Sequence, residues 1–176
     1  TDITVVGSGP SAVHFALSVL KKGHQVVMVD VGESKSDLGG AEHSFKQLKM
    51  ELRDPVKYFL GQSFEAVTYP GALGEYYGFP PSKRYVFSSP PNYRVESTEF
   101  SPLASFARGG LAEAWTGGVY PFNKDELRDF PVDYSHMQAC YSEVAERIGI
   151  SGMRDDLAEF MPMHDHILTP LNLDDH

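Results

Sequence analysis

Cationic residues are scarce in this sequence. It holds 15 Lys and Arg against 24 Asp and Glu, which gives a formal net charge of −9. Nucleic acids and anionic membrane surfaces are bound by clustered Lys and Arg, so this balance excludes a general nucleic-acid-binding role and argues against attachment to a charged membrane. An acidic surface of this kind mainly promotes solubility.

Cysteine is almost absent, because Cys140 is the only one in the chain. A single cysteine cannot form a disulfide within the chain or a redox-active pair, and it fits a reducing compartment, so a cytoplasmic location is expected. No apolar run approaches the roughly 20 residues that cross a bilayer, and no signal-peptide pattern opens the sequence. We therefore expect no membrane span.

A closing structural element is also lacking. The 176 residues, 41% of them hydrophobic, would suffice for one ordinary domain. The first residues lead directly into a strand pattern, however, and residues 171–176 carry no recognisable final element. We therefore expect an incomplete α/β fold, belonging to a larger enzyme or assembly that a second chain or further sequence completes.

The first thirty residues carry the clearest pattern present. Ile3–Val6 reads as a strand, residues 7–12 as a glycine turn, residues 11–22 as a helix that stops at Gly23, and residues 26–30 as a second strand. This order predicts a βαβ unit of the Rossmann-like, dinucleotide-binding kind. The predicted sheet-facing side of the helix consists of Val13, Ala16, Leu17 and Leu20.

Each small residue of the turn has a separate role in holding a pyrophosphate. Gly7 permits the tight turn, Gly9 lets the backbone approach the phosphates, and Ala12 lets the helix pack on the strand. The phosphates would lie at the helix N-terminus, which favours anions. Asp30, at the end of the second strand, is placed to bind the ribose hydroxyls of an adenosine. A carboxylate there disfavours a ribose phosphate and therefore NADP.

Further helix patterns follow along the chain. A helix is predicted over 44–53, another over 136–148 with a capping box formed by Ser135 and Gln138, and a short helical turn near 155–161. Between Gly61 and Pro121, prolines and glycines predict loops and short strands. The aromatic residues of that stretch favour an ordered region wrapped over a ligand or partner, because disordered linkers contain few of them.

A second signature occupies residues 106–118, where two Gly-Gly pairs flank the only tryptophan, Trp115. Such spacing indicates close approach of the backbone to a flat ligand. Together with the N-terminal turn, it resembles the flavin-binding region of the glucose-methanol-choline oxidoreductases, particularly the branch that contains pyranose oxidase. The resemblance implies a Rossmann-like FAD-binding unit over 1–60, a loop-rich flavin-contacting region over 61–122, and a helical segment over 123–176 that leads toward a substrate domain.

The resemblance also implies how FAD would be held. The ADP half would lie on the first turn and the isoalloxazine near the second signature, with Thr116 beside the reactive edge of the flavin. The residues implied for the ADP half are Gly7, Gly9, Pro10, Ser11, Ala12 and Asp30, and those for the flavin half are Arg108, Gly109, Gly110, Trp115, Thr116, Gly117 and Gly118.

Three departures from the family pattern are informative. Ala114 stands where pyranose oxidase has a histidine that bonds to the flavin, so FAD is expected to bind noncovalently. Glu113 stands where many relatives have Asn or Thr, and Asp30 replaces the more common Glu.

The chemistry implied by the resemblance is oxidation of a CH–OH group of an alcohol or sugar, with hydride passing to flavin N5. The catalytic histidine of the family, paired with His or Asn, is expected beyond this chain, so no catalytic residue is assigned. His164-Asp165-His166 comes too early to match that pair, and a solvated polar tail explains it better than a metal site.

Two alternatives stay open. Asp30 followed by Asp37-Leu38-Gly39-Gly40 resembles the amine oxidase and phytoene desaturase pattern, which explains less of the chain. A nucleotide-binding subunit without catalysis would explain the missing catalytic residues.

Overall fold

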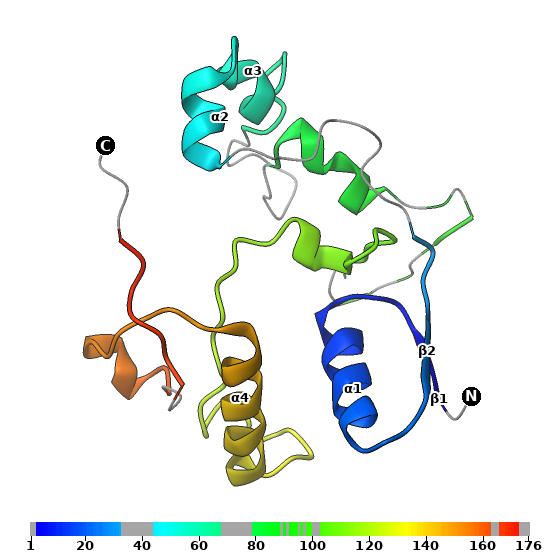
Figure 1. The fold of residues 1–176 in the computed structure, drawn as a ribbon, viewed down its shortest axis with the longest axis vertical. Coiled ribbons are helices and arrows are strands. Elements are labelled where there is room, and N and C mark those ends of the chain that lie inside the picture. The colour runs from blue at the N-terminus through cyan, green and yellow to red at the C-terminus, as the bar shows by residue number, and fades with distance from the viewer. Residues whose placement is uncertain are drawn as a thin grey trace. The chain divides into compact units, whose positions relative to one another are not determined.

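The structure is a computed structural model that describes residues 3–32, 44–67, 79–88, 90, 92–94, 96, 98–99, 103–162 and 166–172. The chain divides into two compact units, Thr1–Thr116 and Gly117–His176. Figure 1 shows the elements of each unit, and they are described separately below.

The first unit contains a small parallel sheet. Strand β1 (Ile3–Val6) pairs with β2 (Val26–Val29) in a register that places Ile3 opposite Val26 and Val6 opposite Val29. Helix α1 (Pro10–Lys21) connects the strands and packs on both of them (Figure 1). The predicted strand–helix–strand order is therefore confirmed, β2 ends one residue before the predicted bound, and the chain is of mixed α/β class.

Helix α1 ends as predicted, at a glycine. Gly23 has φ +86°, a conformation that favours glycine, and its amide donates a hydrogen bond to the Leu20 carbonyl. The predicted buried face is only partly right. Ala16 is buried, but Val19 is the second buried residue of the helix, whereas Val13, Leu17 and Leu20 are exposed. Two four-residue strands make a sheet that is too narrow to cover the whole apolar side of a three-turn helix.

Two short helices follow. Helix α2 (Phe45–Glu51) lies within the range predicted for it and begins at Ser44, which forms a capping box with Gln47. Helix α3 (Pro55–Leu60) was not predicted. It begins at Asp54, whose carboxylate accepts the Lys57 amide at 2.9 Å, so a capping side chain followed by proline starts a helix here.

The stretch predicted as loops and short strands contains two 3-10 helices, η1 (Pro81–Phe87) and η2 (Gly110–Glu113). Its described residues form no strand element, so the expectation of short strands is wrong there. Packing between η1 and η2 and between α3 and η1 makes this stretch, as far as Thr116, part of the first unit. Val86 of η1 and Ala107 are fully or almost fully buried, as an ordered region requires.

The second unit is built around helix α4 (Tyr134–Ile148), which was predicted over 136–148. The predicted capping box is wrong, because Asp133 caps the helix by accepting the Ser135 amide at 2.7 Å. Asp133 lies one residue before the first helical residue, where a cap must stand, whereas Ser135 is already inside the helix.

The rest of the second unit is short. The predicted helical turn near 155–161 is the 3-10 helix η3 (Asp156–Glu159), and a parallel bridge joins Ser151 to Leu168. Leu127 and Ala145 are buried in this unit. Across both units, none of the helices in the described ranges has the length and apolar character needed to cross a membrane.

Candidate functional site

The predicted nucleotide turn lies at the carboxyl edge of the parallel strands. Gly7 directly follows β1, has φ +92°, and donates its amide to the Val29 carbonyl at 2.7 Å. Asp30 directly follows Val29, the last residue of β2. The turn and this carboxylate are therefore held at the same edge of the sheet, where parallel α/β sheets bind their ligands.

Gly9 is not required by the folding of the chain. Its φ of −67° and ψ of 169° are ordinary extended values that any residue adopts. Among the described residues, a Cβ placed there would meet only the Gly109 carbonyl oxygen, at 4.0 Å, so none of these residues fills that space. Gly7 differs, because its positive φ alone accounts for glycine. A turn that a ligand approaches closely is expected to leave such a space beside a glycine.

The N-terminus of α1 opens toward the same turn. Its cap residue is Gly9, which has no side chain to accept the first amides, and its first turn contains no acidic residue. Pro10 has no N–H, and the amides of Ser11 and Ala12 have no acceptor within the helix. These donors and the helix dipole together favour an anion.

Asp30 is an exposed carboxylate held in a fixed orientation. Its Oδ2 accepts the Ser8 hydroxyl at 2.8 Å, and its Oδ1 accepts the Gly32 amide at 2.6 Å. The Ser8 hydrogen bond and then the Gly32 amide lower the pKa of Asp30 below its usual range, and the Arg108 guanidinium contributes less. A carboxylate accepts about four hydrogen bonds, so capacity for sugar hydroxyls remains.

A cavity of about 420 Å³ opens beside Asp30. It is mostly apolar, and the carboxylate is its charged group, a combination that suits an adenosine. Sequence reasoning did not assign the cavity wall that comes from the later part of the unit. The lining residues are Val6, Gly7, Val29, Asp30, Val31, Ser105 and Phe106.

The second signature lies directly on the first glycine turn. The Gly109 amide donates to the Ser8 hydroxyl at 2.9 Å, across 101 positions of sequence. A Cβ placed on Gly110 would come within 3.3 Å of the Gly9 Cα, so the two backbones approach as closely as glycines allow. The structure therefore brings Arg108–Gly110 to Gly7–Gly9, and Arg108 is exposed there.

Glu113, which departs from the family pattern, holds η2 against η1. Its Oε2 accepts the Tyr85 hydroxyl at 2.8 Å, and its backbone carbonyl accepts Lys83 Nζ. Its side chain also folds over Gly109, where an added Cβ would come within 2.7 Å of Glu113 Oε1. A side chain at Gly109 would have to displace this carboxylate, and the φ of +89° favours glycine there in its own right.

Trp115 and Thr116 line a second cavity in the first unit, with a volume of about 310 Å³. Its walls are almost wholly apolar. The ring centroids of Phe79 and Phe87, which line it, lie 4.4 Å apart. Trp115 is 53% exposed, so about half of its side-chain surface is accessible to a ligand. The lining residues are Phe79, Phe87, Leu103, Leu111, Ala114, Trp115 and Thr116.

Gly117 and Gly118 begin the second unit, so they are not placed relative to the residues of the first. Within their own unit, Gly117 has φ +77° and Gly118 lies against the Tyr120 ring.

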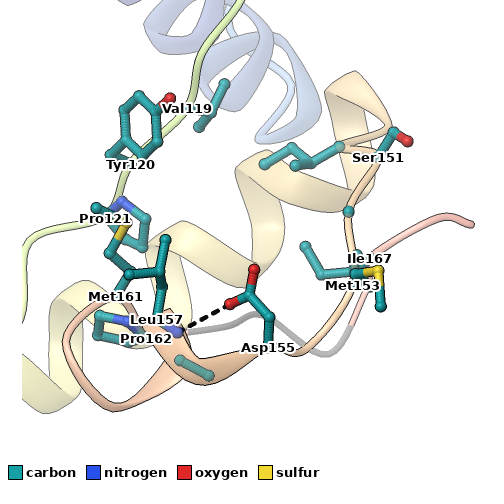
Figure 2. Close-up of a pocket in the computed structure, with 13 residues that line it drawn as sticks. Val119, Tyr120, Pro121, Ser151, Met153, Asp155, Leu157, Met161, Pro162 and Ile167 are labelled. Carbon is teal, nitrogen blue, oxygen red and sulfur yellow. Dashed lines mark hydrogen bonds between the residues drawn. The ribbon is translucent and has the colours of Figure 1, made fainter. Parts of the chain in front are cut away.

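The second unit contains its own cavity of about 230 Å³, between the segment at Tyr120 and the segments around η3 (Figure 2). Its walls are mainly apolar, with Met153 and Met161 among them. Asp155 lies at its edge and accepts the Leu157 amide at 3.0 Å, as Figure 2 shows. No predicted site residue lines it.

The possible metal cluster cannot be placed as a whole, because His164 and Asp165 lie outside the described residues. Asp37 and Gly39-Gly40, which carry the amine oxidase alternative, also lie outside them. Within the parts that are described, no three His, Cys, Asp or Glu residues are arranged to hold a metal ion.

Ser8 is the residue of this site that sequence reasoning missed. It stands between the two glycines of the turn, where the pattern accepts any residue, so the glycine spacing did not single it out. A hydroxyl within a glycine turn was the available signal.

In comparisons with known proteins, no model of a protein family matches the chain, and no curated protein matches it significantly.

Proposed function

We propose that this chain is the FAD-binding portion of a flavin-dependent oxidoreductase that acts on CH–OH groups of an alcohol or sugar. The space beside Gly9 is the observation that carries the proposal. It lies at a helix N-terminus without a side-chain cap, at the same sheet edge as a fixed carboxylate, and none of the described residues fills it.

The proposed fold is Rossmann-like, with β1–α1–β2 as its first unit. The amides of Ser11 and Ala12 would bind the pyrophosphate, and Asp30 would accept the ribose hydroxyls of the ADP half. The cavity beside Asp30 would receive the adenosine. Arg108, exposed next to the turn, would add a positive charge near the phosphates.

The choice of FAD over NAD rests on the second signature. Its glycines lie on the nucleotide turn, and a few residues later it forms a wall of the aromatic cavity at Trp115 and Thr116. An apolar cavity with exposed indole suits an isoalloxazine. Ala114 at that wall offers no nucleophile, so the flavin would be held noncovalently.

When bound, FAD supplies the hydride acceptor for oxidation of the CH–OH group. What this chain would contribute is binding and orientation, because no catalytic residue is assigned within residues 1–176. The assay of this chain is accordingly cofactor binding.

The test is titration of the full chain with FAD, ADP, FMN and NAD, followed through the fluorescence of Trp115, the only tryptophan. We expect FAD to bind and quench Trp115, ADP to compete with it, and FMN, which lacks the adenosine and one of the two phosphates, to bind much more weakly. Acid precipitation should release unmodified FAD.

Two outcomes contradict the proposal. A protein that binds NAD and not FAD belongs to the nicotinamide class, and a protein that binds no adenine dinucleotide has a different function. If FAD is bound by a larger protein that carries no substrate domain, the alternative function is favoured, in which the chain is a nucleotide-binding subunit without catalysis.

A further inference from the structure

Ser8 lies where three parts of the first unit meet. Its hydroxyl donates to Asp30 Oδ2 at 2.8 Å and accepts the Gly109 amide at 2.9 Å. A hydroxyl has a single proton, so donation to Asp30 fixes its direction and leaves its lone pairs for Gly109. The Ser8 side chain therefore orients the Asp30 carboxylate and also holds the second signature, residues 106–118, against the glycine turn.

The backbone contact beside Ser8 reinforces this junction. Gly110 has φ +62°, and a Cβ there would come within 3.3 Å of the Gly9 Cα. The neighbour is backbone, which cannot rotate away as a side chain could. The segment Ala107–Glu113 therefore rests on the nucleotide turn through a hydrogen bond and a close backbone contact.

The far end of the same segment is fastened to η1. Tyr85 donates to the Glu113 carboxylate and Lys83 donates to the Glu113 carbonyl. Phe87 of η1 lines the aromatic cavity together with Leu111 and Trp115. A continuous path of contacts thus runs from Asp30, through Ser8 and Gly109, to the wall of the aromatic cavity.

We propose that Ser8 is a positioning residue that couples the two halves of the cofactor site, so that an adenine nucleotide bound at Asp30 changes the environment of Trp115. This inference rests on the proposed function, because it takes an adenine nucleotide to be the ligand of the turn. Ser8 acts through Asp30 and Gly109 and needs no contact with the reacting atoms.

The probe that tests the coupling is ADP. It lacks the isoalloxazine, and Trp115 is not part of the cavity beside Asp30, so a change in Trp115 fluorescence on ADP binding must pass through the protein. Affinity is measured separately by calorimetry. In the unmodified chain, we expect ADP to bind and to shift the Trp115 emission.

Ser8→Ala removes both hydrogen bonds of the hydroxyl. We expect ADP to bind about 5- to 10-fold more weakly, and the Trp115 response to ADP to be lost even at saturating ADP. Ser8→Thr keeps the hydroxyl and should restore both. Ser142→Ala, which removes a hydroxyl from α4 in the second unit, is the matched control and should change neither.

Gly110→Ala provides an independent route to the same coupling. It leaves the Ser8 hydroxyl in place but forces the segment away from Gly9, so the Trp115 response should fall while most of the ADP affinity remains. The Gly110→Ala variant also tests the coupling if the Ser8→Ala protein does not fold.

The outcomes separate the two proposals. If the unmodified chain binds FAD and ADP, but the Trp115 response to ADP is absent or survives unchanged in Ser8→Ala and Gly110→Ala, the coupling is refuted and the proposed function stands. If the unmodified chain binds neither nucleotide, the proposed function is refuted, and the coupling that rests on it is refuted with it.

Discussion

The phenol of Tyr85 donates a hydrogen bond to Glu113 Oε2 at 2.8 Å and so joins η1 to η2. Partial burial, followed by the hydrogen bond and the negative charge of Glu113, raises the pKa of Tyr85 to about 12. The neutral phenol is therefore the form that the folded chain stabilises. This contribution to stability is fully present below the unfolded pKa of about 10 and is lost as pH rises through 12.

Alkaline titration should reveal this tyrosine. We expect the Tyr85 phenolate to appear near pH 12 in the ultraviolet difference spectrum. Tyr85→Phe should remove that step, and Glu113→Gln should move it to lower pH because the negative charge is gone. A late step that remains in Tyr85→Phe would assign it to another residue.

The two glycines of the nucleotide turn should respond differently to alanine. Gly9→Ala suits its backbone conformation and meets no described atom closer than 4.0 Å, but alanine is a poorer N-cap of α1 than glycine, so the free energy of unfolding should fall by at most about 1 kcal/mol. FAD and ADP should nonetheless bind at least about tenfold more weakly, since the methyl occupies the space assigned to the phosphates.

Gly7→Ala is the matched comparison for Gly9→Ala. Its φ of +92° strains any other residue, and we expect a loss of about 1–2 kcal/mol in the free energy of unfolding. Denaturant melts and nucleotide titrations of both variants check this pair. Full nucleotide affinity in a folded Gly9→Ala protein would mean that no ligand approaches the turn there.

Asp30 should determine which nucleotides bind. Asp30→Asn keeps the shape but loses the charge, so FAD and ADP affinity should fall about tenfold while discrimination against NADP weakens. Because the Ser8 hydrogen bond lowers the Asp30 pKa, the carboxylate stays ionised throughout the range above its ordinary pKa of 3.8. Nucleotide affinity should therefore not depend on Asp30 titration between about pH 5 and 8.

Asp133 should be the residue that stabilises the start of α4. Asp133→Ala removes the cap and should lower the thermal midpoint of the second unit by several degrees, while Gln138→Ala should leave it unchanged. The Ser135 hydrogen bonds lower the Asp133 pKa, so this stabilisation is present above the ordinary carboxyl pKa and is lost as pH falls below it. Circular dichroism melts at neutral and acid pH measure both effects. Equal melting of the two variants would contradict the assignment of the cap.

Locally encoded features were predictable from the sequence. Runs of β-branched residues predicted the two strands, and Gly23 predicted the end of α1, because each of these features depends on a few neighbouring residues. Helix α3 had a local signal too, an Asp54-Pro55 start, but six residues are too few to show a helical period.

Features that depend on distant parts of the chain were not predictable in the same way. Val19 is buried in place of Leu17, because tertiary packing, and not the helical period alone, decides which side chains are covered. The glycines of both signatures could be recognised by spacing, whereas the Ser8 contact with Gly109 depends on how loops 101 positions apart meet. The pairing of Tyr85 with Glu113 is likewise a consequence of tertiary packing.

The narrow sheet bears on how the chain behaves at high concentration. Within the described residues, β1 and β2 have only each other as neighbours, and Val6 is 82% exposed. Outer strand edges offer amides and carbonyls to any extended segment, including one from another copy. The net charge of −9 opposes such association by repulsion. Salt screens that repulsion, so added salt should promote self-association of this chain, and its colloidal stability should be greatest in dilute buffer.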